Sequence, residues 1–383
     1  MVTRFIAGAG GVALRGALAL DPNQYSVTVF SAPGGTLLAE AEQAGFKVVR
    51  LKHMRHQLSL REDPSALREL LDELRKDQFD IVHTHSAKAG VLGRLAAYRA
   101  GVPAIVHTFH GFPFHDFQFA PTRATYIAIE RQLGRITDQF LAVGGAVAAQ
   151  AISLRIAPTE RVRTIGSAIE LNILPASPGN RAAARRLMGV PESAQVVGTV
   201  GRLAPQKAPQ DMVAAIESMG RANVLCVWVG DGPMRDEMTR LIERRGMSKN
   251  FLLLGERTDV AALLPGFDIF ALASHYEGLP CSVVEAMTCG VPVVATAVNA
   301  VPEVVVSGRT GLLVPPGAPA LLGRAMAYLL DHPAEGSRMS VAARNQLGDR
   351  FHPEVLGRDL VETYELALTN SARSVSKVLR LVA

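Results

Sequence analysis

Two carboxylates eight positions apart stand in the stretch EGLPCSVVEAM, which runs from Glu277 to Met287. The residues between Glu277 and Glu285 are small or apolar, so this apolar segment keeps two acids. A carboxylate accepts hydrogen bonds from hydroxyl groups, and a pair can hold two diols. A nucleotide sugar offers two, on its ribose and on its hexose. The alternative is a capping box, because Ser282 and Glu285 form an S-x-x-E pattern, although this leaves Glu277 unexplained.

Two cations stand just past an expected strand. Arg202 and Lys207 follow the apolar run QVVGTVG at residues 195–201. Ligands of open parallel sheets bind at the carboxyl ends of strands, and two cations there can neutralise a diphosphate without a metal ion. Two surface cations are the alternative. Gly230 lies in VGDGPM (residues 229–234), a glycine turn that either contacts a ligand or is an ordinary turn.

A glycine-rich turn opens the chain. FIAGAGG, at residues 5–11, contains Gly10 and Gly11 and leads into an expected helix. Glycines let the backbone approach a phosphate, and a helix N-terminus supplies unpaired N–H donors. A strand should precede this turn, yet only residues 1–6 are available. Either the gene start has been placed late or the first strand is very short.

Histidines are concentrated in the first half. Five of the ten lie between positions 83 and 115: His83, His85, His107, His110 and His115. A metal site is conceivable, but no cysteine or carboxylate cluster accompanies them with ligand spacing. Imidazoles at a cleft donate hydrogen bonds to sugars or phosphates. For His83, His85 and His107 the preferred interpretation is a histidine hydrogen-bonded within the core.

The elements that must position these side chains alternate between strand and helix. Short β-branched runs are expected as strands at residues 25–30, 80–86, 104–110, 139–144 and 162–166, and again at 195–201, 223–230, 250–255, 268–274 and 291–296. Near-continuous apolar strands separated by helices predict parallel sheets covered on both faces. Two such series predict an α/β protein with two Rossmann-like, doubly wound domains. The expected domains are residues 1–172 and 173–355, followed by a C-terminal helix and tail, 356–383.

Composition limits the partners and the compartment. The net charge is +5, with 19 Lys+Arg against 15 Asp+Glu in residues 1–170 and 21 against 20 in the remainder. The basic stretch at residues 46–61 suits an anionic partner or membrane surface, although a solvated basic face is preferred. Arginines are not interleaved with aromatics, so nucleic acid is not expected. Three cysteines fit a reducing cytoplasm, and no run is apolar and long enough to span a membrane. Residues 1–20 loosely mimic a signal peptide, but Arg15 and the glycines argue against one.

Several of these motifs, taken in order, resemble retaining glycosyltransferases of family 4. They are GAGG at residues 8–11, Arg202 with Lys207, GDGP, EGLPCSVVEAMTCGVPVVAT and VPEVV..G.TGLLVPP. The resemblance extends to about Pro316 and is strongest in the second half. It implies the GT-B fold, in which two Rossmann-like domains face each other across a cleft. It also implies transfer of a hexose or N-acetylhexosamine from a nucleotide-diphosphate sugar, with UDP the family's usual nucleotide.

The resemblance assigns roles to residues. Arg202 and Lys207 match the cations on the donor diphosphate, Glu277 matches an acid beside the transferred sugar, and His110 matches a histidine beside the same sugar. Glu285 is expected on the ribose hydroxyls and Arg257 near the base. The other implied donor contacts come from Gly10, Gly11, Gly230 and the backbone N–H groups of Gly278, Leu279 and Cys281. Expected chemistry is retaining and needs no metal or other cofactor, because the cations stabilise the leaving diphosphate.

The sequence departs from the family pattern at two points. Ala208 stands where a glycine usually follows the lysine, and GSAIE (residues 166–170) replaces a commoner Asn-Gly-Val-Asp turn. The acceptor is inferred from VHTHS.KAG and HGF.FH, which resemble stretches in cell-surface polysaccharide enzymes. A lipid-linked saccharide at the inner face of the membrane is therefore expected, in a cytoplasmic, peripheral enzyme. A small natural-product acceptor, a nucleotide-sugar 2-epimerase, a dehydrogenase and a non-catalytic binding protein remain alternatives.

Overall fold

The structure, a computed structural model, describes residues 1–6, 8–55, 57, 59, 61–114, 118–170 and 172–382, with side chains as far as residue 371. It divides into two compact units, Met1–Ala168 with Phe351–Ala383, and Ile169–Arg350. We call these unit 1 and unit 2. The final helix therefore belongs to unit 1. The chain passes between units after Ala168 and after Arg350, where the sequence analysis placed the divisions after residues 172 and 355.

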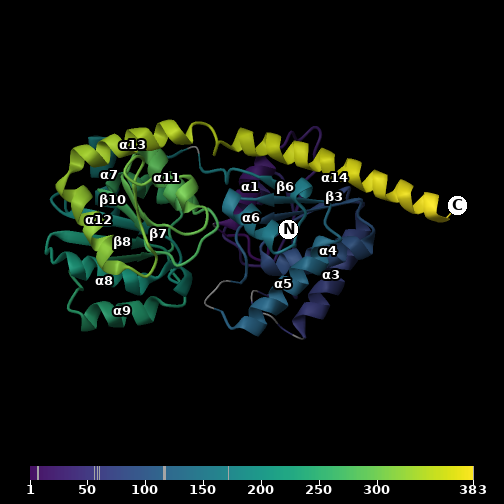
Figure 1. The fold of residues 1–383 in the computed structure, drawn as a ribbon, viewed down its shortest axis with the longest axis horizontal. Helices are drawn as coiled ribbons and strands as arrows, with labels where there is room; N and C mark the ends of the chain where they lie inside the picture. The colour runs from purple at the N-terminus through teal and green to yellow at the C-terminus, as the bar shows by residue number, and fades with distance from the viewer. Residues whose placement is uncertain are drawn as a thin grey trace. The chain divides into compact units, whose positions relative to one another are not determined.

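Unit 1 alternates strands and helices along the chain (Figure 1). Its elements are α1 (Ala9–Leu18), β1 (Thr28–Ser31), α2 (Leu38–Gln43), β2 (Lys47–Arg50), α3 (Glu62–Lys76), β3 (Ile81–His85), α4 (Ala87–Ala100), β4 (Ala104–Phe109), α5 (Ala120–Gly134), β5 (Gln139–Ala142), α6 (Gly145–Ser153), η1 (Thr159–Arg161), β6 (Val162–Thr164) and α14 (Pro353–Val382).

All strand pairs of unit 1 are parallel. β3, β4, β5 and β6 pair in that order, and β1 pairs with β2 in a separate two-stranded sheet. Helix α14 packs against β4, β5 and α1, so the end of the chain covers the sheet built by its beginning. The expected strands are confirmed. β2 was missed, because its sequence, Lys-Val-Val-Arg, places charges at both ends and its residues are only partly buried.

Unit 2 repeats the alternation of strand and helix. Its elements are α7 (Pro178–Met188), β7 (Gln195–Val200), η2 (Pro205–Lys207), α8 (Pro209–Met219), β8 (Val224–Val229), α9 (Arg235–Arg244), β9 (Phe251–Gly255), α10 (Val260–Leu263), η3 (Leu264–Gly266), β10 (Ile269–Leu272), α11 (Cys281–Cys289), β11 (Val293–Thr296), η4 (Val301–Glu303), β12 (Leu312–Val314), α12 (Pro319–Asp331) and α13 (Pro333–Leu347).

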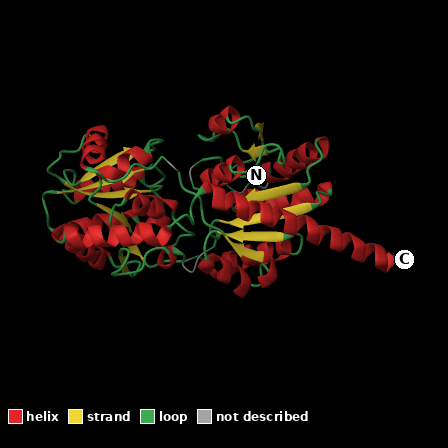
Figure 2. Cartoon of the chain, turned by 90° about the horizontal axis from the view of Figure 1, so that it is seen from above, coloured by secondary structure: helices red, strands yellow, loops and turns green. Residues whose placement is uncertain are grey.

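The sheet of unit 2 is parallel, in the order β12-β11-β10-β7-β8-β9. The strand order therefore reverses between β7 and β10. Because parallel crossovers are right-handed, this reversal sends helices to both faces of the sheet. Helix α8 packs against α12 and α11 against α13, and Figure 2 shows the strands flanked by helices. The expected α/β class with two parallel-sheet units is confirmed. Unit 1 has a four-stranded and a separate two-stranded sheet, and unit 2 has one six-stranded, doubly wound sheet.

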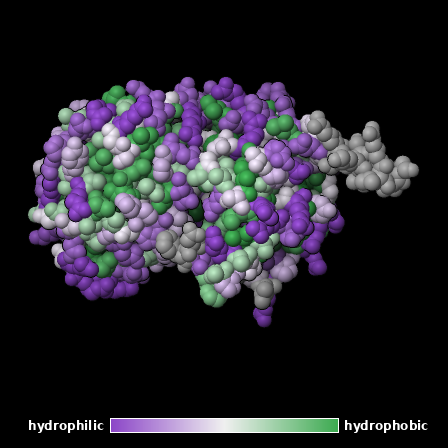
Figure 3. Space-filling view, viewed as in Figure 1, coloured by the Kyte–Doolittle hydropathy of each residue, from purple (hydrophilic) through white to green (hydrophobic). Residues whose placement is uncertain are grey.

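On the face drawn in Figure 3, groups of hydrophobic residues are interspersed with hydrophilic ones. None of the helices in the described part of the chain combines the length and the apolar character that a membrane span requires. Cations of the basic stretch are partly paired. Lys47 lies 2.5 Å from Asp77, and Arg50 lies 2.6 Å from Glu42. These pairs favour the solvated basic face over an anion-binding surface. His56, Leu58 and Leu60 lie outside the described residues.

Candidate active site

The reversal of strand order in unit 2 brings Lys207 and Glu277 together. Lys207 ends η2, which follows β7, and Glu277 lies in the loop after β10. β7 and β10 are paired neighbours, so their carboxyl ends meet at one point of the sheet edge. There Nζ of Lys207 donates to Oε1 of Glu277 at 2.5 Å. A switch point of this kind is where doubly wound sheets bind ligands.

Glu277 is held by several neighbours and is only 7% exposed. Ser274 Oγ donates to the same Oε1 at 2.6 Å, and Gln206 Nε2 donates to Oε2 at 3.2 Å. The backbone N–H of Glu277 donates to Oδ1 of Asn299 at 3.0 Å. A buried carboxylate is costly unless its oxygens accept hydrogen bonds of this kind. The contacts therefore fix the orientation of this side chain.

Three residues of this cluster were absent from the sequence analysis: Gln206, Ser274 and Asn299. A signal for them existed, because each lies in a segment that follows a strand, namely β7, β10 and β11. Asn299 adopts a left-handed backbone with φ 43°. Asparagine tolerates this region better than most residues because its short side chain bonds locally. The asparagine thus serves both the turn and the backbone of Glu277.

Arg202 is exposed, and its loop is fixed by contacts with β8 and with the turn that follows β8. Leu203 N donates to Asp231 O at 3.0 Å, and Trp228 Nε1 donates to Gly201 O at 2.8 Å. A Cβ on Gly230 would lie 2.2 Å from Gly201 O, and its φ is 135°. Gly230 is therefore required for close passage of the Arg202 loop, whatever else it contacts.

His110 follows β4 and forms a pair with His85 of β3. Nδ1 of His85 lies 3.0 Å from Nε2 of His110, so one ring donates and the other accepts. Burial lowers the pKa of His110 to about 4, although the side chain keeps part of its surface exposed. Burial also holds the pKa of His85 well below its usual range, with smaller contributions from neighbouring histidines. Both rings are therefore neutral at pH 7.

The remaining histidines of this region are bound within unit 1. His83 lies 2.8 Å from the hydroxyl of Tyr364 on α14 and 2.7 Å from Oγ1 of Thr108. Nδ1 of His107 lies 2.8 Å from Oγ1 of Thr84. These contacts agree with the expectation that His83 and His107 serve the core, whereas His85 instead supports His110. His115 lies outside the described residues.

Comparison with known proteins assigns the chain to a family. The profile described as Glycosyltransferase Family 4 matches residues 6–172, and that described as Glycosyl transferases group 1 matches residues 180–346. A D-inositol 3-phosphate glycosyltransferase from Thermobispora bispora is 31% identical over 78% of this chain and 73% of its own length. The chain belongs to the group 1/family 4 glycosyltransferases. The resemblance drawn from the sequence motifs is confirmed.

Other relatives of this glycosyltransferase are matched over less of their length. The Escherichia coli UDP-Gal:alpha-D-GlcNAc-diphosphoundecaprenol alpha-1,3-galactosyltransferase is 30% identical over 63% of this chain, and the match spans 64% of that enzyme. A D-inositol 3-phosphate glycosyltransferase of Mycobacterium tuberculosis is 33% identical over 62% of the chain, and the match spans 51% of that protein. The chain thus spans about half to two thirds of these two relatives.

Solved structures confirm the GT-B fold. Anabaena Alr3699/HepE, in complex with UDP and glucose, superposes with a TM-score of 0.81 over 95% of this chain and 99% of its own, at 23% identity. WaaG, a glycosyltransferase involved in lipopolysaccharide biosynthesis, gives 0.76 over 94% and 96% of the two chains, at 17% identity. At these identities the similarity establishes the fold alone.

In this glycosyltransferase the stretch around Glu285 does not form a capping box. Helix α11 begins at Cys281 with Pro280 as its N-cap, so Ser282 lies inside the helix rather than before it. The alternative interpretation of Glu285 as part of a cap is therefore wrong. Glu285 is half-buried one helical turn past Cys281, and the loop containing Gly278 and Leu279 joins this helix to Glu277.

Arg257 lies in a different position from the central cluster. It follows β9, which is two strands from β7 in the sheet. Its guanidinium forms a two-point ion pair with Asp259, with Nε–Oδ1 2.7 Å and Nη2–Oδ2 2.6 Å. The hydrogen bond to Asp259 raises the pKa of Arg257. The structure thus joins Arg257 to Asp259 rather than to Lys207 or Glu277, and a contact with the base stays a prediction.

The departure from the family pattern at Ala208 has a local explanation. Ala208 adopts φ 45°, a left-handed conformation that glycine reaches without strain. The glycine usual at this position therefore has a geometric reason, and the alanine costs about 1 kcal/mol.

Gly10 and Gly11 lie in the first turn of α1. A Cβ on Gly11 would lie 3.2 Å from the guanidinium of Arg15, which donates to Ala168 O at 2.6 Å.

The described residues contain no group of three or more histidines, cysteines or acids arranged to hold a metal ion. The clustered charges of the candidate site are instead a cation and an acid, Lys207 and Glu277, with Arg202 in the same segment as the lysine. Lys207 is 15% and Glu277 5% exposed at the side chain, so the cation can still reach a ligand. An arrangement of this kind can bind a sugar hydroxyl and a phosphate side by side.

Proposed function

We propose that this chain is a retaining glycosyltransferase that uses UDP-sugar and needs no metal ion, moving a hexose or N-acetylhexosamine to a lipid-linked saccharide. The single observation that supports this is the Lys207–Glu277 pair at the switch point of unit 2. An isolated cation would suit many anions. A cation bonded to a buried, oriented carboxylate suits a ligand that presents phosphate and hydroxyl groups together.

The mechanism follows from the charges. Departure of the nucleoside diphosphate leaves negative charge on the phosphate oxygens and positive character on the sugar carbon. Lys207 and Arg202 stabilise the leaving group, and a well-placed donor contributes on the order of 3–4 kcal/mol. Glu277 is not assigned as a base, because it already accepts from Lys207 and Ser274. It orients sugar hydroxyls. The leaving phosphate oxygen takes the proton of the acceptor, which attacks from the same face.

The histidines of unit 1 contribute a neutral imidazole. His85 contacts Nε2 of His110, and no hydrogen bond from another described residue reaches Nδ1, so we propose that Nδ1 meets a ligand hydroxyl or phosphate. We propose that His110 serves the same reaction by contacting the donor sugar. We also propose the remaining donor contacts as the family resemblance implies them: Gly10, Gly11, Gly230, Arg257, Gly278, Leu279, Cys281 and Glu285.

The lipid-linked acceptor is supported by one sequence relative, and one protein of the same fold acts in a related process. The Escherichia coli enzyme is named for transfer to GlcNAc-diphosphoundecaprenol, and WaaG is described as a lipopolysaccharide enzyme. UDP is supported by the same galactosyltransferase and by the HepE complex. Contact with the inner face of the membrane and a cytoplasmic location are part of this proposal. A small polar acceptor is the second candidate, because the Thermobispora relative is named for D-inositol 3-phosphate and matches a longer part of the chain.

A two-step experiment tests the function. UDP-, GDP- and ADP-sugars are first screened by thermal shift, and only UDP-sugars should raise Tm. UDP release is then measured with GlcNAc-diphosphoundecaprenol or with inositol phosphate, before and after treatment with EDTA. Acceptor-dependent release that survives the chelator supports the proposal. Release without an acceptor indicates an epimerase or a hydrolase. Activity that is lost with EDTA and restored by magnesium, or full turnover in the Arg202→Ala/Lys207→Ala double variant, contradicts the proposed chemistry.

A further inference from the structure

Residues 1–3 behave as a strand shared by both sheets of unit 1. Nα of Met1 donates to His83 O at 2.8 Å, and Met1 O accepts from His85 N at 2.8 Å, which is one complete step of a parallel ladder with β3. On the other side, Val2 N donates to Phe30 O at 3.0 Å, and Thr3 O accepts from Ala32 N at 3.2 Å. These bonds join β1 to β3 near their carboxyl ends.

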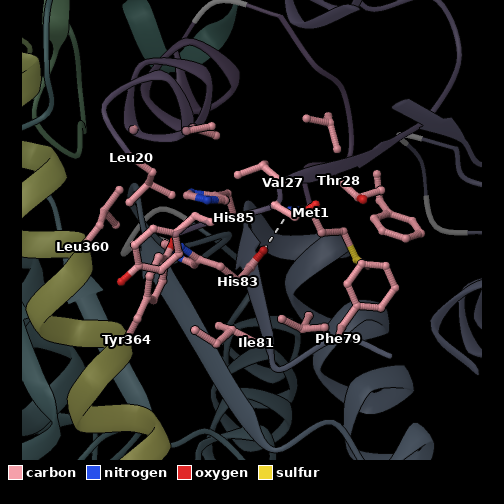
Figure 4. Close-up of a pocket in the computed structure, with 18 of the residues that line it drawn as sticks. Met1, Leu20, Val27, Thr28, Phe79, Ile81, His83, His85, Leu360 and Tyr364 are labelled. Carbon is pink, nitrogen blue, oxygen red and sulfur yellow. Dashed lines mark hydrogen bonds between the residues drawn. The ribbon is translucent and has the colours of Figure 1, made fainter. Parts of the chain in front are cut away.

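Toward the amino ends of β1 and β3 a cavity takes the place of this shared strand. Its volume is about 700 Å³, and Val27 and Thr28 line it on one side and Phe79 and Ile81 on the other. Figure 4 shows these side chains around Met1, with Leu360 of α14 and Leu20 just past α1 nearby. β1 and β3 belong to separate sheets, so the cavity separates two strand edges.

The backbone groups at this cavity have the pattern of an unfilled ladder position. In a parallel strand the bonding groups of alternate residues point to the same side. Since His83 O and His85 N face Met1, the carbonyl of Ile81 and the N–H of His83 face the cavity. By the same rule the carbonyl of Thr28 and the N–H of Phe30 face it from β1. Buried backbone groups of this kind are almost always paired in proteins.

We infer that an extended apolar segment, joined by a peptide bond to the nitrogen of Met1, fills this cavity as the central strand between β1 and β3. The ladder at Met1 already sets its direction and register. A rise of about 3.3 Å per residue allows about four residues beside β1 and the end of β3. Apolar side chains form most of the lining, although Lys47, Asp77 and Asp80 also reach it, so we expect mainly apolar residues in this segment, as in other central parallel strands.

The amino group of Met1 points to the same occupant. It is buried beside His83, and burial lowers its pKa from 8.0 to about 5. An amide N–H at this position would make the same bond to His83 O without any charge to desolvate. A separate polypeptide could pair with the strand edges but would leave this buried amine in place. Continuity with Met1 therefore explains the bond, the cavity and the burial together.

The test adds residues to the full chain. One protein has the extension Met-Lys-Ile-Val-Val in front of Met1, and its matched control has Met-Lys-Asp-Pro-Asp. Thermal unfolding and amide hydrogen exchange are measured for both and for the unextended chain. We expect the apolar extension to raise Tm by at least about 5 °C, because it buries three β-branched side chains. We also expect slower exchange at the amides of Phe30 and His83, and neither effect in the control.

The results can overturn the inference in two ways. Equal Tm values and equal exchange for all three proteins would show that the cavity takes no strand. A free acetylated Lys-Ile-Val-Val peptide that raises Tm where the covalent extension does not would assign the cavity to another polypeptide. A comparable rise with the Asp-Pro-Asp control also contradicts the proposed pairing, because proline cannot complete the ladder and aspartate is unfavourable in a largely apolar cavity.

Discussion

Nζ of Lys207 lies 2.5 Å from Oε1 of Glu277, although 70 positions separate the two residues in the chain. The pair is largely buried, at 15% and 5% side-chain exposure. Removal of either partner leaves a charge with poor solvation, which is costly in a protein interior. If the proposed chemistry holds, changes to this pair should alter stability and catalysis together, and the two residues can be tested as a pair.

Lys207→Ala should reduce kcat by roughly 10²–10³-fold, because the proposed donor to the leaving diphosphate is lost. It should also lower the free energy of unfolding by roughly 3 kcal/mol, since Glu277 then stays buried without its cation. Glu277→Ala should have a similar cost, and the double variant should lose less than the sum. The matched control is Arg245→Ala, which breaks the exposed pair with Glu217 and should cost less than about 1 kcal/mol. Additive single losses would contradict the coupling.

Ser274→Ala removes the hydroxyl that donates to Glu277 at 2.6 Å. The carboxylate keeps Lys207 but loses one constraint on its orientation. We expect a loss of about 1.5–3 kcal/mol in stability, as for other hydrogen bonds to charged groups, together with reduced kcat. Ser218→Ala, on α8, removes a hydroxyl bonded to Ala215 O and serves as the control, with kcat unchanged. Urea unfolding and steady-state kinetics measure the two effects, and equal kcat in both variants would rule out an orienting role for Ser274.

Asn299 combines a left-handed backbone with a bond to Glu277 N, and two variants separate these contributions. Asn299→Gly removes the bond but keeps the backbone conformation accessible. Asn299→Ala removes the bond and adds backbone strain of about 1 kcal/mol. The alanine variant should therefore be the less stable of the two by urea unfolding. Equal stabilities would show that the conformation at this position imposes no cost on alanine.

Gly230→Ala should destabilise unit 2 by more than about 2 kcal/mol, because the new Cβ would lie 2.2 Å from Gly201 O. Displacement of that segment also moves Arg202, so donor affinity should fall. Gly220→Ala is the control, since Gly220 has φ 62° with nothing within 4 Å of its Cβ position. It should cost only about 1 kcal/mol and leave donor affinity unchanged. Calorimetric titration with UDP compares the two variants.

Stability should fall as pH decreases below 6.5. Burial lowers the pKa of His110 from 6.5 to about 4, so the unfolded chain binds this proton at a higher pH than the folded chain does. The contribution of His110 to the free energy of unfolding therefore rises with pH between about 4 and 6.5. Above that range this contribution is complete. The buried amino group of Met1 acts in the same direction between pH 8 and 5. His110→Gln should flatten the dependence below pH 6.5, and an unchanged slope in urea titrations at pH 5 and 7 would contradict this account.

The fold class was readable from the sequence because buried parallel strands are apolar throughout. Composition alone predicted β4 and β7, from the apolar residues at 104–110 and 195–201. β2 was not predicted, because it is a partly exposed strand whose terminal residues are charged. For the first strand the sequence analysis left two explanations open, a late gene start or a very short strand. Residues 1–3 form only one end of a ladder between β1 and β3.

The candidate site was readable only in part. Glu277, Arg202 and Lys207 stood out because charged residues directly follow apolar runs. Ser274 and Asn299 did not, since a lone serine or asparagine after a strand is common in loops. His85 was assigned to the core, and its contact with His110 depends on a pairing between β3 and β4 that places residues 25 positions apart side by side.

The sequence by itself determined the α/β class and the candidate residues at strand ends, because these depend on local composition and short spacing. Tertiary structure alone decided which of them meet. Strand order follows from how helices pack on both faces of the sheet. This order places β10 directly beside β7, whereas β9 lies two strands from β7. That order joins Glu277 to Lys207 and leaves Arg257 with Asp259. Contacts between residues 70 positions apart depend on the packing of the whole unit, which no short stretch of sequence records.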